Sequence, residues 1–309
     1  MAYPFTFFIA HYIKFFLLIA PEHLKSSYKC FTGQNWLPVP FHYFQPIIKR
    51  EMLPDNYDQI ESPLIGIDLH IDDQLLLLSK FQWNKELQDI PLNRSGGLQP
   101  YYRNQNFRSG DAEILYNMIR YYKPKKIIEI GSGFSTLFML SAIEQNKKEN
   151  RGNATALKCI EPFERRWLED LGITIVREPV ESIDLRFFKQ LSENDFLFID
   201  SSHVIRTKGD VVFEYLNIIP VLAKGVIVHC HDIFFPKDYP LKYLLEYKYF
   251  WNEQYLLQAL LANSPKYKPL LALKFLSCHY RSHLEKCCPI FKKENEEEGP
   301  GSFWFQIVQ

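Results

Sequence analysis

The sequence predicts an α/β fold, in which a mainly parallel sheet carries helices on both faces. First, short apolar runs alternate with stretches of helical periodicity from residue 110 onward, as in repeated β-α-β units. Second, these runs are continuously apolar, which is typical of strands buried on both faces. Third, 309 residues with 47% hydrophobic and 23% charged residues are enough to bury a full core without disulfides or metals.

The expected elements follow in a regular order. Apolar residues recur at helical spacing from Asp111, which can cap a helix that Pro124 ends. The strands expected after this helix are 126–130, 156–160, 173–176, 196–200 and 226–229, and the helices between them are 135–144, 164–171, 185–191 and 209–219. Two last strands, 269–275 and 303–308, are expected to form an antiparallel pair at one edge, with a solvated loop over 292–300 between them.

The first third of the chain has no such regularity. Residues 21–105 are irregular and rich in proline, asparagine and aromatic residues, with helical pieces such as 72–81. We therefore expect an N-terminal extension and cap over 1–105 and the main domain over 106–309.

Residues 3–20 are strongly apolar but carry His11 and Lys14. A lysine in mid-span costs roughly 2.5–3.5 kcal/mol on insertion scales, so we expect no transmembrane helix, and the segment lacks the pattern of a signal peptide. We expect a helix that docks on the body or on a second subunit, as in a homodimer, with a peripheral membrane contact as the alternative.

Charge and cysteine usage exclude several classes of protein. The 36 Lys and Arg residues balance 36 Asp and Glu residues, so no net field attracts a polyanion and we expect no nucleic-acid partner. The six cysteines are scattered without a secretory framework, which favours a reducing compartment and a cytoplasmic location.

A glycine pair follows the first expected strand, in the stretch Glu129-Ile-Gly131-Ser-Gly133-Phe-Ser135-Thr136. Glycines let the backbone turn sharply and approach a ligand, and the helix behind them offers unpaired N–H groups. A dinucleotide fingerprint has a third glycine where Thr136 stands, which argues against a nicotinamide oxidoreductase. The acidic Glu129 suits a cationic ligand better than a pyrophosphate.

The second strand ends at Glu161. An acid at this strand tip can accept hydrogen bonds from both ribose hydroxyls of a nucleoside. The glycine pair and this acid together predict a nucleoside cofactor with a positively charged centre.

Polar residues also crowd the ends of the next two strands. Asp200-Ser201-Ser202-His203 follows one strand, and His229-Cys230-His231-Asp232 closes the other. Because the carboxyl ends of parallel strands meet at one edge of a sheet, we expect these acids and histidines to converge over the cofactor. His229 is equally well explained as a core histidine.

Two mechanisms fit this convergence. Either His203 or His231 removes a proton from a hydroxyl, with a carboxylate orienting the ring. Alternatively, Asp200, His231 and Asp232 hold a divalent ion such as Mg²⁺, which lowers the pKa of that hydroxyl.

A further cluster offers zinc-type ligands along a helix. Its members are Cys278, His279, His283, Cys287 and Cys288. Such clusters are common by chance, and we do not expect zinc here.

With these residues in view, the chain resembles the class I S-adenosylmethionine-dependent methyltransferases. The stretch 129–133 looks like their first motif, and Glu161 looks like their ribose-binding acid. More closely, the chain is similar to a bacterial small-molecule family, the methyltransferase-24 type. The stretches that carry this similarity are Gly110-Asp111-Ala112, 198–211, 225–240, 251–257 and 301–305, with 40–44 upstream.

The resemblance implies a Rossmann-like, seven-stranded sheet with an antiparallel last strand, and methyl transfer by in-line attack on the sulfonium of S-adenosylmethionine. The cofactor-binding residues expected are Glu129, Gly131, Ser132, Gly133, Ser135, Glu161, Asp200 and Ser201. The catalytic residues expected are Asp200, His203, His231 and Asp232, and the substrate-pocket residues are His42, Tyr43, Phe234 and Tyr239.

The expected function is O-methylation of a sugar, a glycan precursor or another small molecule. The alternative from a different class is a non-catalytic subunit that binds S-adenosylmethionine or serves as a scaffold in a glycan-assembly complex. Cofactor binding without turnover on any acceptor distinguishes the second hypothesis from the first.

Overall fold

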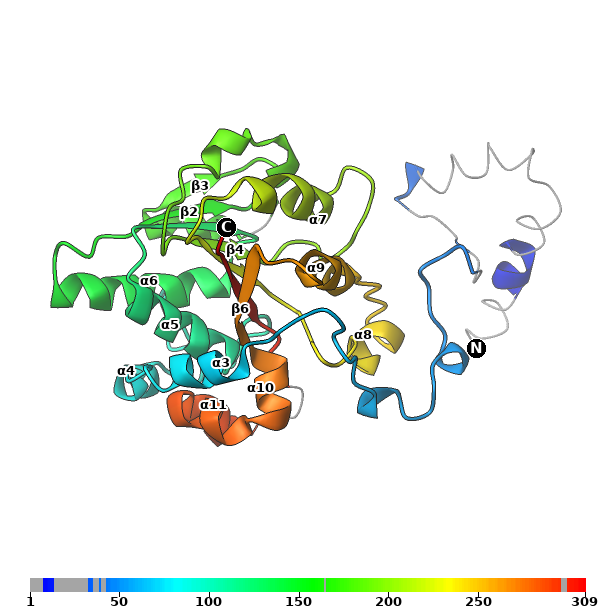
Figure 1. Ribbon diagram of the computed structural model, residues 1–309. Coiled ribbons are helices and arrows are strands. Elements are labelled where there is room, and N and C mark those ends of the chain that lie inside the picture. The colour runs from blue at the N-terminus through cyan, green and yellow to red at the C-terminus, as the bar shows by residue number, and fades with distance from the viewer. Residues whose placement is uncertain (1–7, 14–32, 36–38, 40–42, 164, 296–298) are drawn as a thin grey trace. The chain divides into compact units, whose positions relative to one another are not determined.

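The computed structural model describes residues 8–13, 33–35, 39, 43–163, 165–295 and 299–309 (Figure 1). The chain divides into two compact units, which we call unit 1 (Met1–Asp55 with Leu244–Phe250) and unit 2 (Asn56–Tyr243 with Trp251–Gln309). The boundary predicted between residues 105 and 106 therefore falls inside unit 2. Within the described ranges, no helix is both long enough and apolar enough to cross a membrane.

Unit 2 is built on one seven-stranded sheet with the order β3-β2-β1-β4-β5-β7-β6. The strands are β1 (Lys126–Ile130), β2 (Ala156–Ile160), β3 (Thr174–Val176), β4 (Phe196–Ile199), β5 (Ile227–Cys230), β6 (Tyr267–Ala272) and β7 (Phe303–Ile307). The first five strands pair in parallel, and β7 runs antiparallel between β5 and β6. The predicted fold class and the antiparallel last pair are confirmed.

The helices connect these strands and flank them. The α-helices are α3 (Ile71–Leu78), α4 (Asn84–Asp89), α5 (Asp111–Tyr122), α6 (Phe134–Glu149), α7 (Asp210–Phe213), α8 (Leu241–Leu245), α9 (Glu253–Leu261), α10 (Leu273–His279), α11 (Arg281–Cys287) and α12 (Pro289–Glu294). The 3-10 turns are η1 (Arg50–Met52), η2 (Tyr57–Gln59), η3 (Arg166–Leu171), η4 (Val180–Ser182), η5 (Leu185–Phe187) and η7 (Ile219–Val221), and η6 (Glu214–Ile218) is a π-helix.

Alternation along the strands divides the core into two layers. In β1, Ile127 packs in one layer with α5 and α6, whereas Ile128 and Ile130 pack in the other layer with α7 and α9. Figure 1 shows α5 and α6 on one side of the sheet and α7 on the other. Both faces of the sheet are covered, which explains why its strands are continuously apolar.

Several predicted elements differ from the structure. The helices expected at 164–171 and 185–191 are only the short 3-10 turns η3 and η5. Arg165 and Gly172 flank η3 in the left-handed region, which does not continue a right-handed helix. The strand expected at 269–275 ends at Ala272, where α10 begins. The loop expected from residue 292 begins later, since α12 continues to Glu294, and its acidic part, 296–298, lies outside the described residues.

Candidate active site

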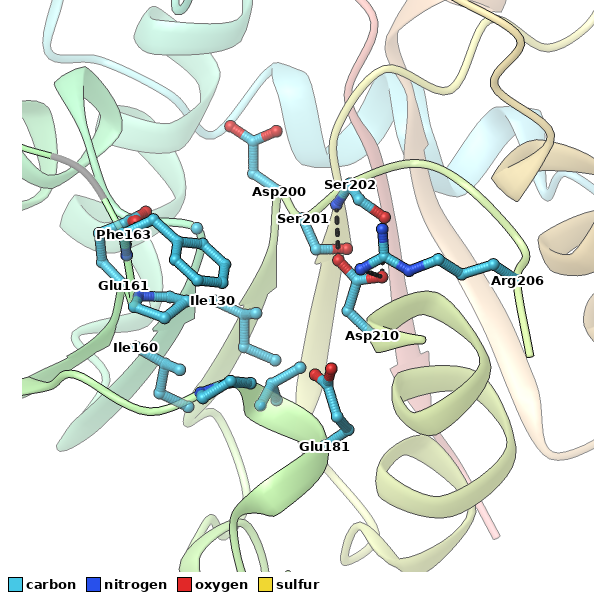
Figure 2. A pocket seen from close by; sticks show the side chains of 14 residues that line it. Ile130, Ile160, Glu161, Phe163, Glu181, Asp200, Ser201, Ser202, Arg206 and Asp210 are labelled. Carbon is cyan, nitrogen blue, oxygen red and sulfur yellow. Dashed lines mark hydrogen bonds and ion pairs between the residues drawn. The ribbon is translucent and has the colours of Figure 1, made fainter. Parts of the chain in front are cut away.

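A cavity of about 320 Å³ opens beyond the carboxyl ends of β1, β2 and β4 (Figure 2). We call it the cofactor cavity. Its lining consists of Ile130, Gly131, Ile160, Glu161, Pro162, Phe163, Pro179, Val180, Glu181, Asp200, Ser201, Ser202, Arg206 and Asp210. Its volume is typical of small-molecule sites, and open α/β sheets bind ligands at this edge.

Gly131 joins the strand tips that frame this cavity. Its φ of +79° lies in the left-handed region, and a Cβ at this position would lie only 1.7 Å from the backbone oxygen of Asp200. Its N–H donates to the carbonyl of Ile160, and the N–H of Asp200 donates to the carbonyl of Ile130. Only glycine fits here, because it alone lets β1 and β4 approach so closely.

Glu129 lies beneath the glycine loop and does not line the cofactor cavity. Its fully buried carboxylate accepts hydrogen bonds of 2.6 Å from the hydroxyls of Ser135 and Thr136. Thr136 in turn accepts from the N–H of Gly133, so it caps the first turn of α6 where a dinucleotide fingerprint has glycine. Burial raises the pKa of Glu129 to about 7. Glu129 and Ser135 thus hold the loop in shape from below.

Glu161 lies at the tip of β2 and lines the cofactor cavity, as the sequence predicts. Ile160 and Val180 supply apolar walls, and Glu181, which the sequence analysis did not single out, adds a second carboxylate. Apolar walls suit a nucleobase, and a carboxylate at a strand tip suits ribose hydroxyls. The residues present therefore fit a nucleoside ligand.

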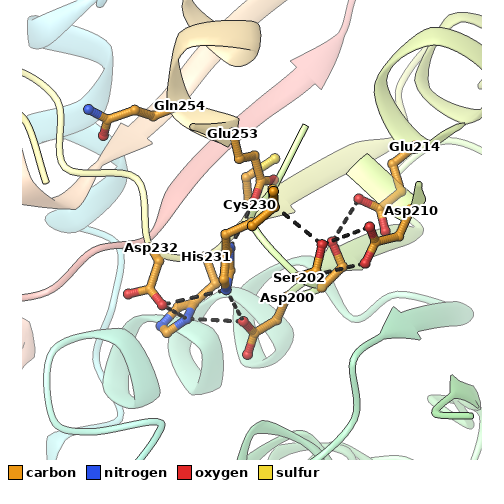
Figure 3. Close-up of polar contacts among 12 residues, drawn as sticks. Asp200, Ser202, Asp210, Glu214, Cys230, His231, Asp232, Glu253 and Gln254 are labelled. Carbon is orange, nitrogen blue, oxygen red and sulfur yellow. Dashed lines mark hydrogen bonds and ion pairs between the residues drawn. The ribbon is translucent and has the colours of Figure 1, made fainter. Parts of the chain in front are cut away.

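A second group of polar side chains lies at the ends of β4 and β5. We call it the acid–histidine cluster, and its members are Asp111, Asp200, His203, His231, Asp232 and Glu253. Figure 3 shows Asp200, His231 and Asp232 turned toward one another. Asp200 belongs to both the cluster and the cofactor cavity, so the two sites adjoin at this carboxylate.

The two histidines approach the same pair of aspartates. Nε2 of His203 lies 3.3 Å from Asp200 Oδ1 and 3.6 Å from Asp232 Oδ2. Nδ1 of His231 lies 3.4 Å and 3.6 Å from these same two oxygens. The convergence predicted from the sequence is therefore present in the structure.

Asp111 and Glu253 complete the cluster from two helix N-termini. Asp111 Oδ2 lies 3.8 Å from Nε2 of His231, and Glu253 Oε2 lies 2.8 Å from Nδ1 of His203. The sequence analysis gave neither residue a role in the site. Both belong to stretches that carry the family resemblance, Gly110-Asp111-Ala112 and 251–257. This resemblance is the feature of the sequence that could have identified them as site residues.

A single helical segment supports the cluster from behind. Asp210 accepts hydrogen bonds from the N–H and the hydroxyl of Ser202. One turn later, Glu214 accepts from the hydroxyl of Ser201 at 2.9 Å, and the hydroxyl of Tyr215 donates to Glu253 Oε1 at 2.8 Å. The π-helix η6 allows the last two residues to reach the strand ends together. Such insertions are frequent at functional sites.

Two cluster residues have unusual backbone angles. His203 has a φ of +59° and Asp232 a φ of +54°, both in the left-handed region, although neither is a glycine. Residues other than glycine rarely adopt this conformation, which persists where the surrounding structure fixes it and occurs often at functional sites.

Burial and charge together determine the protonation of the cluster. Burial alone lowers the pKa of His203 and His231, but the neighbouring carboxylates outweigh burial and raise both pKa values well above the usual range. Burial raises the pKa of Asp200, yet the two histidines hold it below the usual range, whereas burial prevails at Asp232 and raises its pKa. In the protein alone, the carboxylates therefore favour the protonated form of both rings.

Asp200, His231 and Asp232 are also the residues predicted to hold a divalent ion. They offer one ligand atom each, and these atoms lie within 4.8 Å of one another. Two carboxylate oxygens and an imidazole nitrogen suit a divalent cation such as Mg²⁺ or Mn²⁺. The donor set fits a metal ion, whose presence stays a prediction.

The cysteines and histidines at 278–288, in which the sequence offers zinc-type ligands, do not converge as the acid–histidine cluster does. The adjacent Cys287 and Cys288 are buried with sulfur atoms 4.0 Å apart, Cys278 is exposed, and His279 lies 3.0 Å from Glu61. Among the described residues, the cysteines and histidines of this cluster do not bring three ligand atoms together.

Three other predicted residues are buried. His229 stacks on Phe198 at 3.8 Å and contacts the hydroxyl of Ser302, and burial lowers its pKa well below the usual range, as expected for a core histidine. Phe234 and Tyr239 are almost fully buried and do not line the cofactor cavity. The Tyr239 hydroxyl instead accepts from the N–H of Gln254 at the start of α9, so it supports that helix.

The remaining predicted residues have separate locations. Ser132 and Gly133 form the glycine loop without lining the cofactor cavity, whereas Ser201 lines it. Tyr43 is exposed and belongs to unit 1, and His42 lies outside the described residues, so their role in a substrate pocket stays a prediction.

Comparisons with known proteins agree with this architecture. The methyltransferase-24 model, described as a methyltransferase domain, matches residues 128–233. An uncharacterized protein of Archaeoglobus fulgidus is 32% identical over 168 residues, which are 50% of this chain and 74% of that protein.

Solved structures show a more distant likeness. One is an O-methyltransferase from Bacillus cereus in complex with SAH (11% identity, 76% of this chain, 91% of that chain, TM-score 0.36). Another is the O-methyltransferase TomG from Streptomyces achromogenes, involved in tomaymycin synthesis, in complex with SAM (14% identity, 85% of this chain, 100% of that chain, TM-score 0.37). At these TM-scores neither structure assigns a role to a residue of this chain.

Proposed function

This chain belongs to the methyltransferase-24 family of class I S-adenosylmethionine-dependent methyltransferases, and we propose that it methylates a hydroxyl oxygen of a small molecule. The acceptor class proposed is a sugar, a glycan precursor or a comparable metabolite. The observation that carries the proposal is the junction at Asp200, where the cofactor cavity meets the acid–histidine cluster.

The cofactor cavity would bind and orient the nucleoside part of the methyl donor. Glu161 would accept hydrogen bonds from the ribose hydroxyls, while Ile160 and Val180 would contact the adenine. Asp200 would face the positively charged end. When bound, S-adenosylmethionine supplies a methyl group already activated by its sulfonium, so the chain's main task is alignment of the acceptor oxygen.

His203 is the better placed of the two histidines to receive the acceptor's proton. Its Nδ1 is held by Glu253, which leaves Nε2 to face the aspartates and the acceptor. Both ring nitrogens of His231 likewise approach carboxylates of the cluster, but His231 is also one of the three residues whose ligand atoms could hold a cation. Because the carboxylates favour the protonated form of His203, an acceptor or a cation that engages Asp200 and Asp232 would make this ring a better proton acceptor.

A divalent ion held by Asp200, His231 and Asp232 would be compatible with His203 as the proton acceptor. It would lower the pKa of the acceptor hydroxyl and leave His203 outside the ligand set. The metal requirement is therefore part of the proposal to be measured.

Calorimetric titration with S-adenosylmethionine, with and without Mg²⁺ and after treatment with a chelator, tests the first step. We expect micromolar binding. S-adenosylhomocysteine release on a panel of sugar nucleotides and other hydroxyl acceptors then tests transfer, and a loss of release in chelator that Mg²⁺ restores identifies the metal. Absence of binding by a folded protein contradicts the proposal. Binding without release on any acceptor supports the non-catalytic alternative, which no contact described above favours.

A further inference from the structure

Arg165 lies directly over the glycine loop. A Cβ on Gly133 would lie 3.0 Å from Nε and 3.1 Å from Cζ of Arg165, so the guanidinium covers the backbone of this loop. The same guanidinium lies over the ring of Phe134, the first residue of α6, with Cζ 5.0 Å from the ring centroid. A cation therefore lies beside Gly133, which belongs to the part of the loop outside the lining of the cofactor cavity.

The charge of Arg165 has no carboxylate partner among the described residues. Its one hydrogen bond to a side chain runs from Nη2 to the amide oxygen of Asn106, at 3.3 Å. The neighbouring Arg177 pairs with Glu169, and Arg206 pairs with Asp210 at 3.4 Å. Figure 2 shows Arg206 across the cavity from Glu161 and turned toward Asp210. A half-buried arginine with no anion among the described residues is unusual, because guanidinium groups in such places are normally paired.

The backbone holds Arg165 in this place. Its φ of +58° lies in the left-handed region. Arg177 donates to the carbonyl of Arg165 at 3.3 Å and to the carbonyl of Glu161 at 2.6 Å. The Arg177 side chain therefore fixes both the strand tip that carries Glu161 and the turn that carries Arg165.

The charges of the cofactor cavity leave a need for such a cation. Glu161, Glu181 and Asp200 are all acidic and line the cavity, and the arginine in its lining, Arg206, is paired with Asp210. The three acids suit hydroxyl, amino and sulfonium groups but repel a carboxylate. A donor with its ribose at Glu161 and its sulfonium at Asp200 would have its amino-acid tail bound outside these acids, and the glycine loop, which contacts Asp200 at Gly131, is a candidate position for it.

We propose that Arg165, with Asn106 beside it, binds the α-carboxylate of S-adenosylmethionine and so selects a donor that carries the intact methionine tail. The inference rests on the proposed function, since it assumes this donor. The first N–H groups of α6, a helix of 16 residues, lie at the same point and add to the attraction for an anion. A guanidinium recognises a carboxylate with two parallel hydrogen bonds.

Calorimetry with two ligands distinguishes recognition of the carboxylate by Arg165 from a general contribution of Arg165 to donor binding. The ligands are S-adenosylmethionine and its decarboxylated form, which keeps the adenosine, the sulfonium and the amine. For Arg165→Ala we expect binding of S-adenosylmethionine to weaken about tenfold, while binding of the decarboxylated form stays unchanged or tightens. Arg165→Lys keeps the charge without the paired donors and should lose less than Arg165→Ala.

Arg166→Ala is the matched control, because Arg166 is exposed and next in sequence. It should bind both ligands as the unmodified protein does, and circular dichroism checks that each variant is folded. An unchanged affinity for S-adenosylmethionine in Arg165→Ala, or an equal loss for both ligands, overturns the inference. A failure of the unmodified protein to bind S-adenosylmethionine contradicts the proposed function itself, and is thus a distinct result.

Discussion

The cofactor cavity and the acid–histidine cluster share Asp200, but their polar side chains differ in what they face. In the cavity, the Glu161 and Glu181 carboxylates line an open space. In the cluster, His203 and His231 are each 5% exposed and Glu253 is fully buried, and the charged groups already contact one another. The cavity is therefore preformed for a ligand, whereas an acceptor or a cation must compete with existing contacts in the cluster. Binding and chemistry should consequently respond to different substitutions.

The substitution His203→Ala gives the sharpest test of this separation. We expect turnover to fall about a thousandfold, because a positioned general base contributes roughly 10²–10⁴ in rate. The affinity for S-adenosylmethionine should stay the same, because His203 does not line the cofactor cavity. The measurements are S-adenosylhomocysteine release and calorimetric titration. Full activity would remove His203 from the mechanism.

Glu129→Gln tests the support under the cavity through its pH dependence. The pKa of Glu129 is raised from 4.5 to about 7 by burial, so folding stability from this group is full below pH 4.5 and falls as the pH rises toward 7. The loss amounts to about 3 kcal/mol, because one pKa unit corresponds to about 1.4 kcal/mol. Urea unfolding at pH 4.5 and 7.5 should show this loss in the unmodified protein and a smaller one in the variant. Equal pH dependence of both proteins contradicts the assignment.

Glu161→Ala should affect binding alone. We expect the affinity for S-adenosylmethionine to weaken by about 2 kcal/mol, because the ribose hydroxyls lose a charged acceptor. Asp170→Ala, a change at an exposed acid outside the cavity lining, is the matched control for charge. Calorimetry measures both variants, and unchanged binding in Glu161→Ala would refute its ribose role.

Glu253→Gln tests whether the cluster acts as one unit. Glu253 positions His203 and does not line the cofactor cavity, so we expect a drop in kcat of about tenfold with an unchanged affinity for the donor. In a His203→Ala background the same substitution should cause no further drop, because its effect runs through that ring. An additive effect in the double variant would instead indicate a purely structural role for Glu253.

The cavity could be predicted from the sequence better than the cluster, for a physical reason. Gly131 and Glu161 lie directly after strands, and the carboxyl ends of parallel strands meet at one edge whatever the rest of the fold does. Asp200, His231 and Asp232 were predicted to converge by the same rule. Asp111 and Glu253 come from helix N-termini, whose position depends on tertiary packing that no local pattern specifies.

The local sequence pattern also did not predict how deeply the residues after β5 are buried. Phe234 and Tyr239 follow β5 and were expected at the wall of a substrate pocket, a role that stays a prediction, and their near-complete burial inside unit 2 could not be read from the sequence. The π-helix η6 was likewise expected to be an ordinary part of one helix over 209–219. The bonding pattern of a π-helix depends on neighbours distant in sequence, here Ser201, Cys230 and Glu253.

The π-helix makes the number of residues in this helix matter as much as their identity. Removing one residue between Glu214 and Ile218 would restore a regular α-helix, and would turn the preceding residues by about 100° relative to those that follow. Asp210 and Tyr215 could then no longer hold Ser202 and Glu253 while Ile218 and Ile219 keep their places in the core. A single-codon deletion in this segment should therefore damage the site more than most single substitutions there, and homologous chains that act in the same way should keep its length.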